Sequence, residues 1–104
     1  MNIQFKKGAL ELCVLSLLAK RDYYGYELVD ALEEGVDIAE GSVYPLLRRL
    51  KEDGLVDTYL QESSGGPPRK YYRITGQGLS VCHELSAEWK AFVAAVARIM
   101  EEKT

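Results

Sequence analysis

The chain has 104 residues, of which 47% are hydrophobic and 28% are charged. This composition is typical of a folded globular protein, and the length allows one small domain whose buried surface a partner subunit would increase. The net charge of -3 argues against a protein that binds nucleic acid with its whole surface, so any basic site must be local.

The cysteines and the apolar runs indicate the cellular compartment of the protein. Cys13 and Cys82 lie within apolar patterns, lack CxxC spacing and follow no secretion signal, which predicts buried, reduced thiols. The longest apolar run, Leu12 to Ala19, is much shorter than the roughly 20 residues of a membrane-spanning helix. We therefore expect a cytoplasmic protein without a membrane segment.

Two helices are expected in the first third of the chain. From Lys7 to Lys20 apolar side chains cover nearly every helical face, which is typical of a core helix. A turn is expected from Arg21 to Gly25, followed by a short helix that stops at Gly35. In that helix we expect an apolar face of Tyr26, Leu28, Val29 and Leu32 and solvent-facing acids at Glu27, Asp30, Glu33 and Glu34.

A third helix is predicted in the segment GSVYPLLRRLKEDGLV, which spans Gly41 to Val56. Its aliphatic residues follow the i, i+3, i+4, i+7 rule, so one side packs inward. That inward side consists of Val43, Leu46, Leu47 and Leu50. The opposite side gathers small residues and cations, namely Gly41, Pro45, Arg48 and Glu52, flanked by Tyr44 with Lys51 and by Ser42 with Arg49.

Pro45 leaves two starts open for this helix. If Ser42 is the cap, Pro45 lies among the first amides, which have no intrahelical acceptor, and it costs little. If the helix begins a turn earlier, near Ala39, Pro45 removes one hydrogen bond and should bend the axis.

The periodicity changes after Gly54. Residues 56–61 alternate in polarity and residues 69–74 form a second extended run, which predicts the two strands of a hairpin. The segment SSGGPP between them predicts a flexible loop instead of a tight turn, so the hairpin should project. Tyr71 and Tyr72 are expected to pack within the sheet.

A break at Thr75 to Gly78 precedes one long helix, about 40 Å in length. Its apolar residues repeat in steps of three and four, the pattern of a helix that packs on another helix. Because a small domain contains no second long helix, we infer a homodimer. Its interface is expected to consist of Cys82, Leu85, Trp89, Phe92, Val96, Ile99 and Met100.

Three helices followed by a hairpin is the element order of the winged helix-turn-helix. We therefore expect a mainly α fold with a small antiparallel β-hairpin (α+β). Residues 1–75 would form the winged helix-turn-helix DNA-binding domain and residues 76–104 the C-terminal dimerisation helix. In this fold the third helix reads DNA and the hairpin is the wing.

Three segments of the chain resemble the PadR family of transcriptional regulators: YGYEL (Tyr24 to Leu28), GSVYPLLRRLKEDGLV, and RKYYRIT (Arg69 to Thr75). The likeness extends from about residue 6 to residue 99, and the single-helix tail is similar to the compact branch of the family. It implies a dimeric repressor and leads us to expect a response to aromatic or planar small molecules.

Two departures from the family pattern have structural implications. Ala39 stands where relatives often have a capping serine or a similar residue, which would weaken the start of the reading helix. Gly76 to Gly78 replace a charged turn, and we expect these glycines to loosen the connection between the wing and the dimer helix.

The docking geometry of helix-turn-helix proteins identifies the first candidate DNA contacts. The N-terminal part of the reading helix enters the major groove, and arginine suits bidentate contacts to guanine or to phosphate. The family resemblance favours DNA contact over solvated surface charge at these positions. The candidates on this helix are Ser42, Tyr44, Pro45, Arg48 and Arg49.

The second candidate DNA site is the segment PPRKYYR, a basic patch without an acid in an acidic chain. Arg69 and Lys70 lie nearest the loop and are expected to reach the DNA backbone or the minor groove. Arg73 is expected to pair instead with an acid of the domain. Lys51 is expected to be an ordinary surface charge of the reading helix.

Trp89 has two alternative roles. A lone tryptophan on a dimer helix is most often interface core. In multidrug-binding members of the PadR family, paired tryptophans from the two subunits stack planar ligands across a central cavity, and Trp89 falls at the matching place. The expected small-molecule site consists of Trp89, Phe92, Val93, Val96, Leu12 and Leu15.

No enzyme activity, metal site or cofactor is expected. His83 is the only histidine, which excludes a metal site with several histidines within one subunit. We do not expect a Ser-His-Asp triad either. A buried Cys82 beside an exposed His83 is expected, and not a Cys-His metal site between subunits. Two alternative functions are a winged-helix protein-interaction module and a thiol sensor that uses Cys13 or Cys82.

Overall fold

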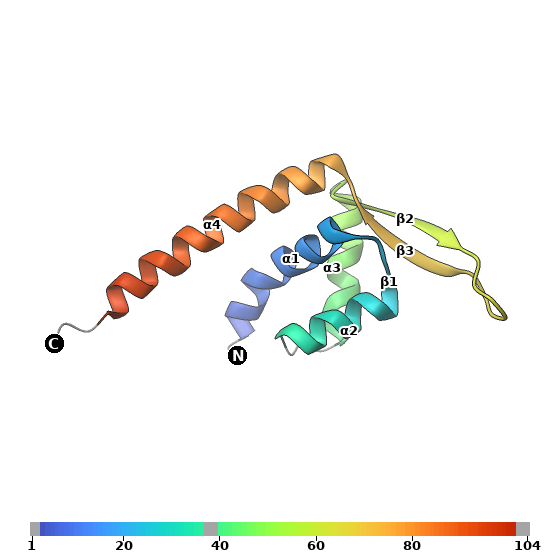
Figure 1. Cartoon of the computed structure of the whole chain (residues 1–104), viewed down its shortest axis with the longest axis horizontal. Coiled ribbons are helices and arrows are strands. Elements are labelled where there is room, and N and C mark those ends of the chain that lie inside the picture. Colours follow the sequence, from blue (N-terminus) through green and yellow to red (C-terminus); the bar gives the residue numbers. More distant parts are fainter. Residues whose placement is uncertain (1–2, 37–39, 102–104) are drawn as a thin grey trace.

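The computed structural model describes residues 3–36 and 40–101, and the side chains of residues 9–36 and 41–101 within them. The elements follow in the order α1 (Ile3–Lys20), β1 (Tyr23–Tyr24), α2 (Gly25–Val36), α3 (Glu40–Glu52), β2 (Val56–Gln61), β3 (Arg69–Ile74) and α4 (Gly76–Met100). The β2–β3 hairpin and α4 project from opposite sides of the helical body, so the described molecule measures 63 × 26 × 20 Å (Figure 1).

The core lies between α1, α2, α3 and the base of the hairpin. The inward side predicted for α3 is confirmed, because Val43, Leu46, Leu47 and Leu50 are all buried. They pack with aliphatic residues of the other two helices, including the completely buried Leu15 and Leu28. Burial of one such side chain is worth about 1.5–3 kcal/mol, so this small cluster holds the three helices together.

Two expectations about α2 are wrong. Tyr26 is 67% exposed, because at 100° per residue it lies about 115° from the middle of the buried Leu28, Val29 and Leu32 stripe. Glu27 is only half exposed: it accepts a hydrogen bond from the Tyr24 amide at 3.2 Å and lies 3.5 Å from the Arg21 guanidinium. The carboxylate of Glu27 therefore caps the helix start. The helix also continues one residue past Gly35.

The sheet contains a strand that the sequence did not predict. β2 and β3 coincide with the two extended runs, but the strand order is β1-β3-β2, all antiparallel. Tyr23 pairs with Tyr72 and Tyr24 with Tyr71, so the middle of the expected turn from Arg21 to Gly25 is a third strand. Two residues are too short to show a periodicity.

The described part of α3 begins before Ser42. The helix starts by Glu40 and contains Pro45 in its interior, which confirms the earlier of the two expected starts. Proline has no amide hydrogen, so the carbonyl of Gly41 loses its usual acceptor role within the helix. The expected bend stays a prediction, and Ala39 lies outside the described residues.

α3 ends in a turn of the Schellman type. The Gly54 amide donates to the Lys51 carbonyl at 3.0 Å, and the Leu55 amide donates to the Leu50 carbonyl at 2.9 Å. Gly54 has φ 77°, a left-handed conformation that glycine adopts without strain. The turn satisfies the last carbonyls of α3 and sends the chain directly into β2.

The start of α4 is fixed to this turn. Thr75 caps α4 by accepting from the Gly78 amide at 3.0 Å, while its hydroxyl donates to the Gly54 carbonyl at 2.7 Å. The Thr75 amide donates to the Leu55 carbonyl at 3.1 Å. The expected break over residues 75–78 is therefore wrong: Gly76 begins the helix. Gly78, which we expected to loosen the connection, lies against Leu55 and donates to the Thr75 cap.

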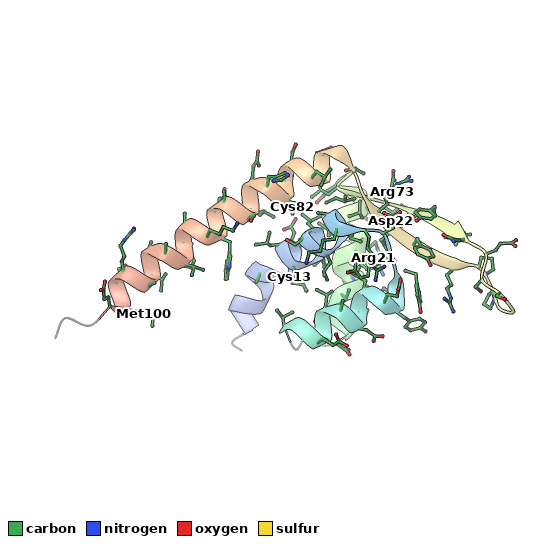
Figure 2. The ribbon with its side chains drawn as sticks, viewed as in Figure 1. Cys13, Arg21, Asp22, Arg73, Cys82 and Met100 are labelled. Atoms are coloured by element: carbon green, nitrogen blue, oxygen red, sulfur yellow. The ribbon has the colours of Figure 1, made fainter. Side chains whose placement is uncertain are left out.

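Only the first part of α4 packs on the helical body. Cys82 is buried and its sulfur lies 3.8 Å from the Ser16 hydroxyl of α1; Leu85 packs against the core. The remainder projects, and Met100 lies near its far tip (Figure 2). The predicted α+β winged helix-turn-helix with a long C-terminal helix is confirmed.

Both cysteines are free thiols, and they differ in burial. Cys82 is buried as expected, whereas Cys13 is only half-buried, because it lies on the side of α1 that other elements only partly cover. Removal of the Cys13 thiol from water raises its pKa. Within the residues that the structure describes, no helix is both long and apolar enough to cross a membrane.

Candidate nucleic-acid interface

The exposed face of α3 carries most of the residues predicted to contact DNA. Ser42, Pro45, Arg48 and Arg49 are exposed. Tyr44 differs because it is half-buried and lies against α2: a Cβ added at Gly25 would be 3.2 Å from the Tyr44 hydroxyl oxygen. The side chain of Tyr44 thus faces the start of α2, at the edge of the exposed face.

The two arginines of α3 have different partners. Arg49 lies 3.5 Å from the Glu11 carboxylate of α1. Arg48 makes no ion pair with an acid among the described side chains, and its positive charge acts on Tyr72 of β3. Burial raises the pKa of the Tyr72 hydroxyl, and Arg48 opposes that rise. Arg48 is therefore the arginine of α3 whose charge no acid among the described side chains neutralises.

Lys51 links α3 to the wing. Its ammonium group donates to the Thr58 hydroxyl of β2 at 2.8 Å. The expectation of an ordinary surface charge is incomplete, because this exposed hydrogen bond ties the last turn of α3 to the strand that follows it.

The cations of β3 lie on tyrosine rings. The Arg69 guanidinium carbon is 4.7 Å from the centre of the Tyr24 ring, and the Lys70 ammonium is 5.8 Å from the centre of the Tyr72 ring. Cation–π attraction of this kind restrains a long side chain without neutralising its charge. Arg69 and Lys70 thus stay exposed and charged, as a phosphate contact requires.

Arg73 does not form the expected ion pair with an acid among the described residues. It lies instead over the Tyr59 ring, with 5.3 Å between the guanidinium carbon and the ring centre. The Tyr59 hydroxyl donates to Asp22 at 2.6 Å, and this hydrogen bond is the first cause of its raised pKa. Asp22 and Arg73 accordingly lie near each other where the hairpin meets the helical body (Figure 2).

Tyrosine rings form a row across the three strands. Tyr59 and Tyr71 stack with ring centres 5.5 Å apart, and the Tyr24 ring follows at 5.8 Å from Tyr71. Tyr72 points to the other face and is buried. The expectation that Tyr71 and Tyr72 pack within the sheet is confirmed, and the row joins the wing to β1 and hence to α2.

A cleft of about 570 Å³ separates the wing from the two helices that precede it. We call it the wing cleft. Its lining consists of Tyr24 of β1, Gly25 and Tyr26 at the start of α2, Tyr44 of α3, the loop 63–68, and Arg69, Lys70 and Tyr72 of β3.

The wing cleft brings together only part of the predicted DNA-binding set. Tyr44, Arg69 and Lys70 meet there, whereas Ser42 and the two arginines of α3 lie outside its lining. Tyr24 and Tyr26 belong to the cleft but were not predicted as site residues. Both tyrosines belong to the segment YGYEL, which carried part of the family resemblance. Its sequence does not show that the wing lies opposite these tyrosines across a cleft.

The residues predicted for the dimer interface divide into two groups. Cys82 is buried in the chain's own core, and Leu85 is half-buried against that core. Beyond them α4 carries an apolar stripe, which we define as Trp89, Phe92, Val93, Val96, Ile99 and Met100. Exposure reaches 56% at Phe92 and 84% at Ile99, values unusual for large apolar side chains in such a row.

The predicted small-molecule site is also only partly assembled in one chain. Trp89 and Phe92 lie together, with ring centres 6.5 Å apart, and Val93 is exposed beside them. Leu12 of α1 is half-buried, but Leu15 is completely buried in the core. Leu15 therefore offers no surface to a ligand in this arrangement of the chain.

Comparison with known proteins gives a consistent family assignment. Residues 14–84 match the family described as transcriptional regulator PadR-like. A transcriptional regulator of Mycobacterium tuberculosis is 32% identical over 82 residues, which cover 78% of this chain and 76% of that protein.

Solved structures agree with this match. The crystal structure of a PadR-like transcriptional regulator from Bacillus cereus is 37% identical, with a TM-score of 0.87 and coverage of 96% of this chain and 99% of that one. A PadR-like transcription factor from Bacteroides fragilis is 44% identical, with a TM-score of 0.77 and coverage of 92% and 94%.

Proposed function

Because the chain belongs to the PadR-like family of transcriptional regulators, we propose that it is a homodimeric repressor that binds a palindromic operator. Family membership already implies DNA-binding regulation, and it agrees with the expectation that the chain is not an enzyme. The proposal adds the oligomeric state, the form of the operator and the residues that make contact. In this proposal the protein acts in the cytoplasm, residues 1–75 bind DNA and residues 76–104 form the dimer.

One observation carries the DNA-binding part of this proposal. The wing cleft places Tyr44 of α3 beside Arg69 and Lys70 of the wing, in a lining without a carboxylate among the described residues. An acidic chain thus concentrates positive charge beside its reading helix. In the proposed complex Ser42, Pro45 and Arg48 face the major groove, and the wing cations contact the backbone. Arg49 is assigned a weaker role because Glu11 partly neutralises it.

The apolar stripe of α4 supports the homodimer. Trp89, Phe92, Ile99 and Met100 are all exposed on a helix that extends far from its own domain. A second copy supplies a complementary stripe by symmetry. Crossed α4 helices would then hold two α3 helices about 34 Å apart, the repeat that separates half-sites on one face of B-DNA.

An effector site at the dimer interface is the remaining part of the proposal. Trp89 and Phe92 offer two neighbouring aromatic rings, which suit a planar aromatic ligand. Such a ligand releases DNA only if it binds the DNA-free arrangement of the dimer more tightly than the DNA-bound one. Titration of planar aromatic compounds should quench Trp89 fluorescence and lower operator affinity; absence of quenching with every compound would count against this site.

The test of DNA binding combines mutation with salt dependence. Wild-type protein is assayed by gel shift on the DNA upstream of its own coding sequence and on operators selected from a random duplex library. We expect binding that weakens steeply as salt rises, because several cations displace counterions from DNA. The variant with both Arg48→Ala and Arg69→Ala should lose most of the affinity.

A matched control is the variant with both Lys90→Ala and Arg98→Ala. It removes two exposed cations of α4 and therefore causes the same change in net charge, yet it should bind DNA with nearly wild-type affinity. Equal retention by the two double variants would reject the assigned contacts. Absence of salt-dependent binding to any duplex would favour the alternative, a winged-helix module that binds another protein.

A further inference from the structure

The wing cleft contains residues that the proposed major-groove contacts do not explain. Tyr26 occupies the first turn of α2, is 67% exposed and lines the cleft. Its ring meets the Tyr24 ring edge-on at 6.5 Å. A large exposed side chain of this kind has no role in the core, since the buried stripe of α2 lies on another side of the helix.

The polar groups of the wing cleft suit an anion. Arg69 and Lys70 supply positive charge, and the hydroxyls of Tyr26 and Ser64 supply neutral donors. The nearby carboxylate of Glu27 is engaged by the Arg21 guanidinium and the Tyr24 amide and does not line the cleft. Among the described residues, the lining thus attracts negative charge without an internal acid to neutralise its cations.

The walls of the cleft are held in position from both sides. On the wing side, Ser63 donates to the Pro67 carbonyl at 2.7 Å and shapes the loop. Between the walls, the Arg69 guanidinium lies over the Tyr24 ring. On the helix side, Gly25 has no side chain, which lets the Tyr44 hydroxyl approach the start of α2. Preorganised donors lose less conformational entropy when a ligand binds.

The position of the cleft indicates the source of the anion. It adjoins the exposed face of α3 through Tyr44, and α2 begins on the side of the body from which the hairpin projects (Figure 1). In the docking proposed above, α3 lies in a major groove and the wing cations contact the backbone beside it, so a DNA strand would pass between α3 and the wing. Its phosphates then lie where the cations and hydroxyls converge.

We propose that the wing cleft seats a backbone phosphate of duplex DNA, and that the Tyr26 hydroxyl donates a hydrogen bond to that phosphate beside Arg69. This inference rests on the proposed DNA-binding function and extends it to a residue outside the reading helix and the wing. The contact positions α3 in the groove and is independent of base sequence, because every nucleotide presents the same phosphate.

The test uses an operator duplex selected from a random library by the wild-type protein, and the variant Tyr26→Phe, which removes only the hydroxyl. A hydrogen bond to a charged group predicts a loss of about tenfold in affinity. The slope of affinity against salt should stay unchanged, since no cation is lost. Because Tyr26 is exposed, the thermal unfolding of Tyr26→Phe should match that of the wild type.

Tyr71→Phe is the matched control, since Tyr71 lies outside the cleft lining. It should bind the selected duplex as the wild type does.

A second measurement locates the phosphate. Single phosphates of the selected duplex are replaced in turn by neutral methylphosphonates, and the affinity of each duplex is measured for wild type and for Tyr26→Phe. At one position in each half-site, replacement should weaken the wild type more than the variant, because both proteins lose the attraction of Arg69 but only the wild type also loses the hydrogen bond from Tyr26. Such a coupling identifies the partner of the hydroxyl.

The possible results separate the two proposals. The phosphate seat is refuted, while operator binding stands, if Tyr26→Phe binds the selected duplex as tightly as the wild type. It is also refuted if the ratio of wild-type to variant affinity is the same on every methylphosphonate duplex as on the unmodified one. If the wild type enriches no duplex at all, the proposed function and the phosphate seat fail together.

Discussion

Gly78 of α4 lies directly against the backbone carbonyl of Leu55 in the turn that ends α3. A Cβ at position 78 would overlap the Leu55 oxygen and come within 2.7 Å of the Ile74 side chain. With the two hydrogen bonds that Thr75 donates to Gly54 and Leu55, this contact fixes α4 to the end of α3. The direction of the proposed dimer helix is therefore coupled to that of the reading helix.

The first prediction concerns this contact. Gly78→Ala should lower the free energy of unfolding by about 1–3 kcal/mol, because the added methyl group meets backbone that cannot move without opening the turn. Gly76→Ala is the control: nothing lies within 4 Å of a Cβ there, and alanine in a helix gains up to about 1 kcal/mol over glycine. Urea denaturation of both variants measures the difference. Equal stabilities would contradict the close approach.

The second prediction separates the two arginines of α3. Arg48→Ala should weaken operator binding by about 1–3 kcal/mol, the range of a good contact to a base. Arg49→Ala should weaken it less, because Arg49 lies 3.5 Å from Glu11. Competitive gel shifts on a selected operator provide the comparison, and a greater loss with Arg49→Ala would reverse our assignment.

The variant Glu11→Gln tests the reason for that difference. It removes the negative charge beside Arg49, and we expect operator affinity to rise. The folding stability should change by no more than about 1 kcal/mol, since both side chains are partly exposed to solvent. An unchanged affinity would show that Glu11 does not restrain Arg49.

Periodicity explains why the larger elements were predictable from sequence. The inward side of α3 and the alternation in the hairpin are repeated patterns, each of which indicates one type of structure. The same rule explains two failures. β1 has only two residues, and Tyr26 lies well away from the apolar stripe of α2, although its residue type suggested burial.

Contacts between distant segments were not predictable. The glycines at 76–78 resemble a helix break until Leu55 is placed beside Gly78, and the partner of Arg49 lies on another helix. The wing cleft is a further case, because it joins α2, α3 and the wing loop. Such placements depend on how the elements pack, which no local pattern records.

The third prediction addresses the homodimer. Phe92→Asp places a carboxylate in the middle of the apolar stripe of α4, and burial of an unpaired charge in an interface is strongly unfavourable. We expect sedimentation velocity to show a dimer for the wild type at micromolar concentration and a monomer for the variant. Because Phe92 is 56% exposed in the single chain, the monomer should stay folded, as circular dichroism would show.

The control for this variant is Ala94→Asp, which adds the same charge to the exposed opposite side of α4. It should sediment as the wild type does. A wild type that is monomeric at these concentrations, or two variants that dissociate to the same extent, would remove the support for crossed α4 helices. The spacing argument for a palindromic operator would then be lost as well.

The fourth prediction follows from the hydrogen bond between Tyr59 and Asp22. This bond raises the pKa of Tyr59 in the folded protein, so the unfolded chain loses the phenolic proton first as the pH rises. Stability from this group is present below the unfolded value, about 10, and is lost as the pH passes through the folded pKa. The wild type should be more stable than Tyr59→Phe at pH 8, and the difference should shrink above about pH 10.

Urea midpoints measured from pH 8 to pH 11 test this dependence on the Tyr59 proton. Asp22→Asn is the matched comparison, because it keeps an acceptor oxygen but removes the negative charge that opposes ionisation of Tyr59. It should lower the pKa of Tyr59 and begin to lose stability at a lower pH than the wild type. A constant difference between wild type and Tyr59→Phe across the whole range would show that the hydrogen bond does not control this ionisation, and that the base of the wing is held chiefly by the stacked rings of Tyr59 and Tyr71.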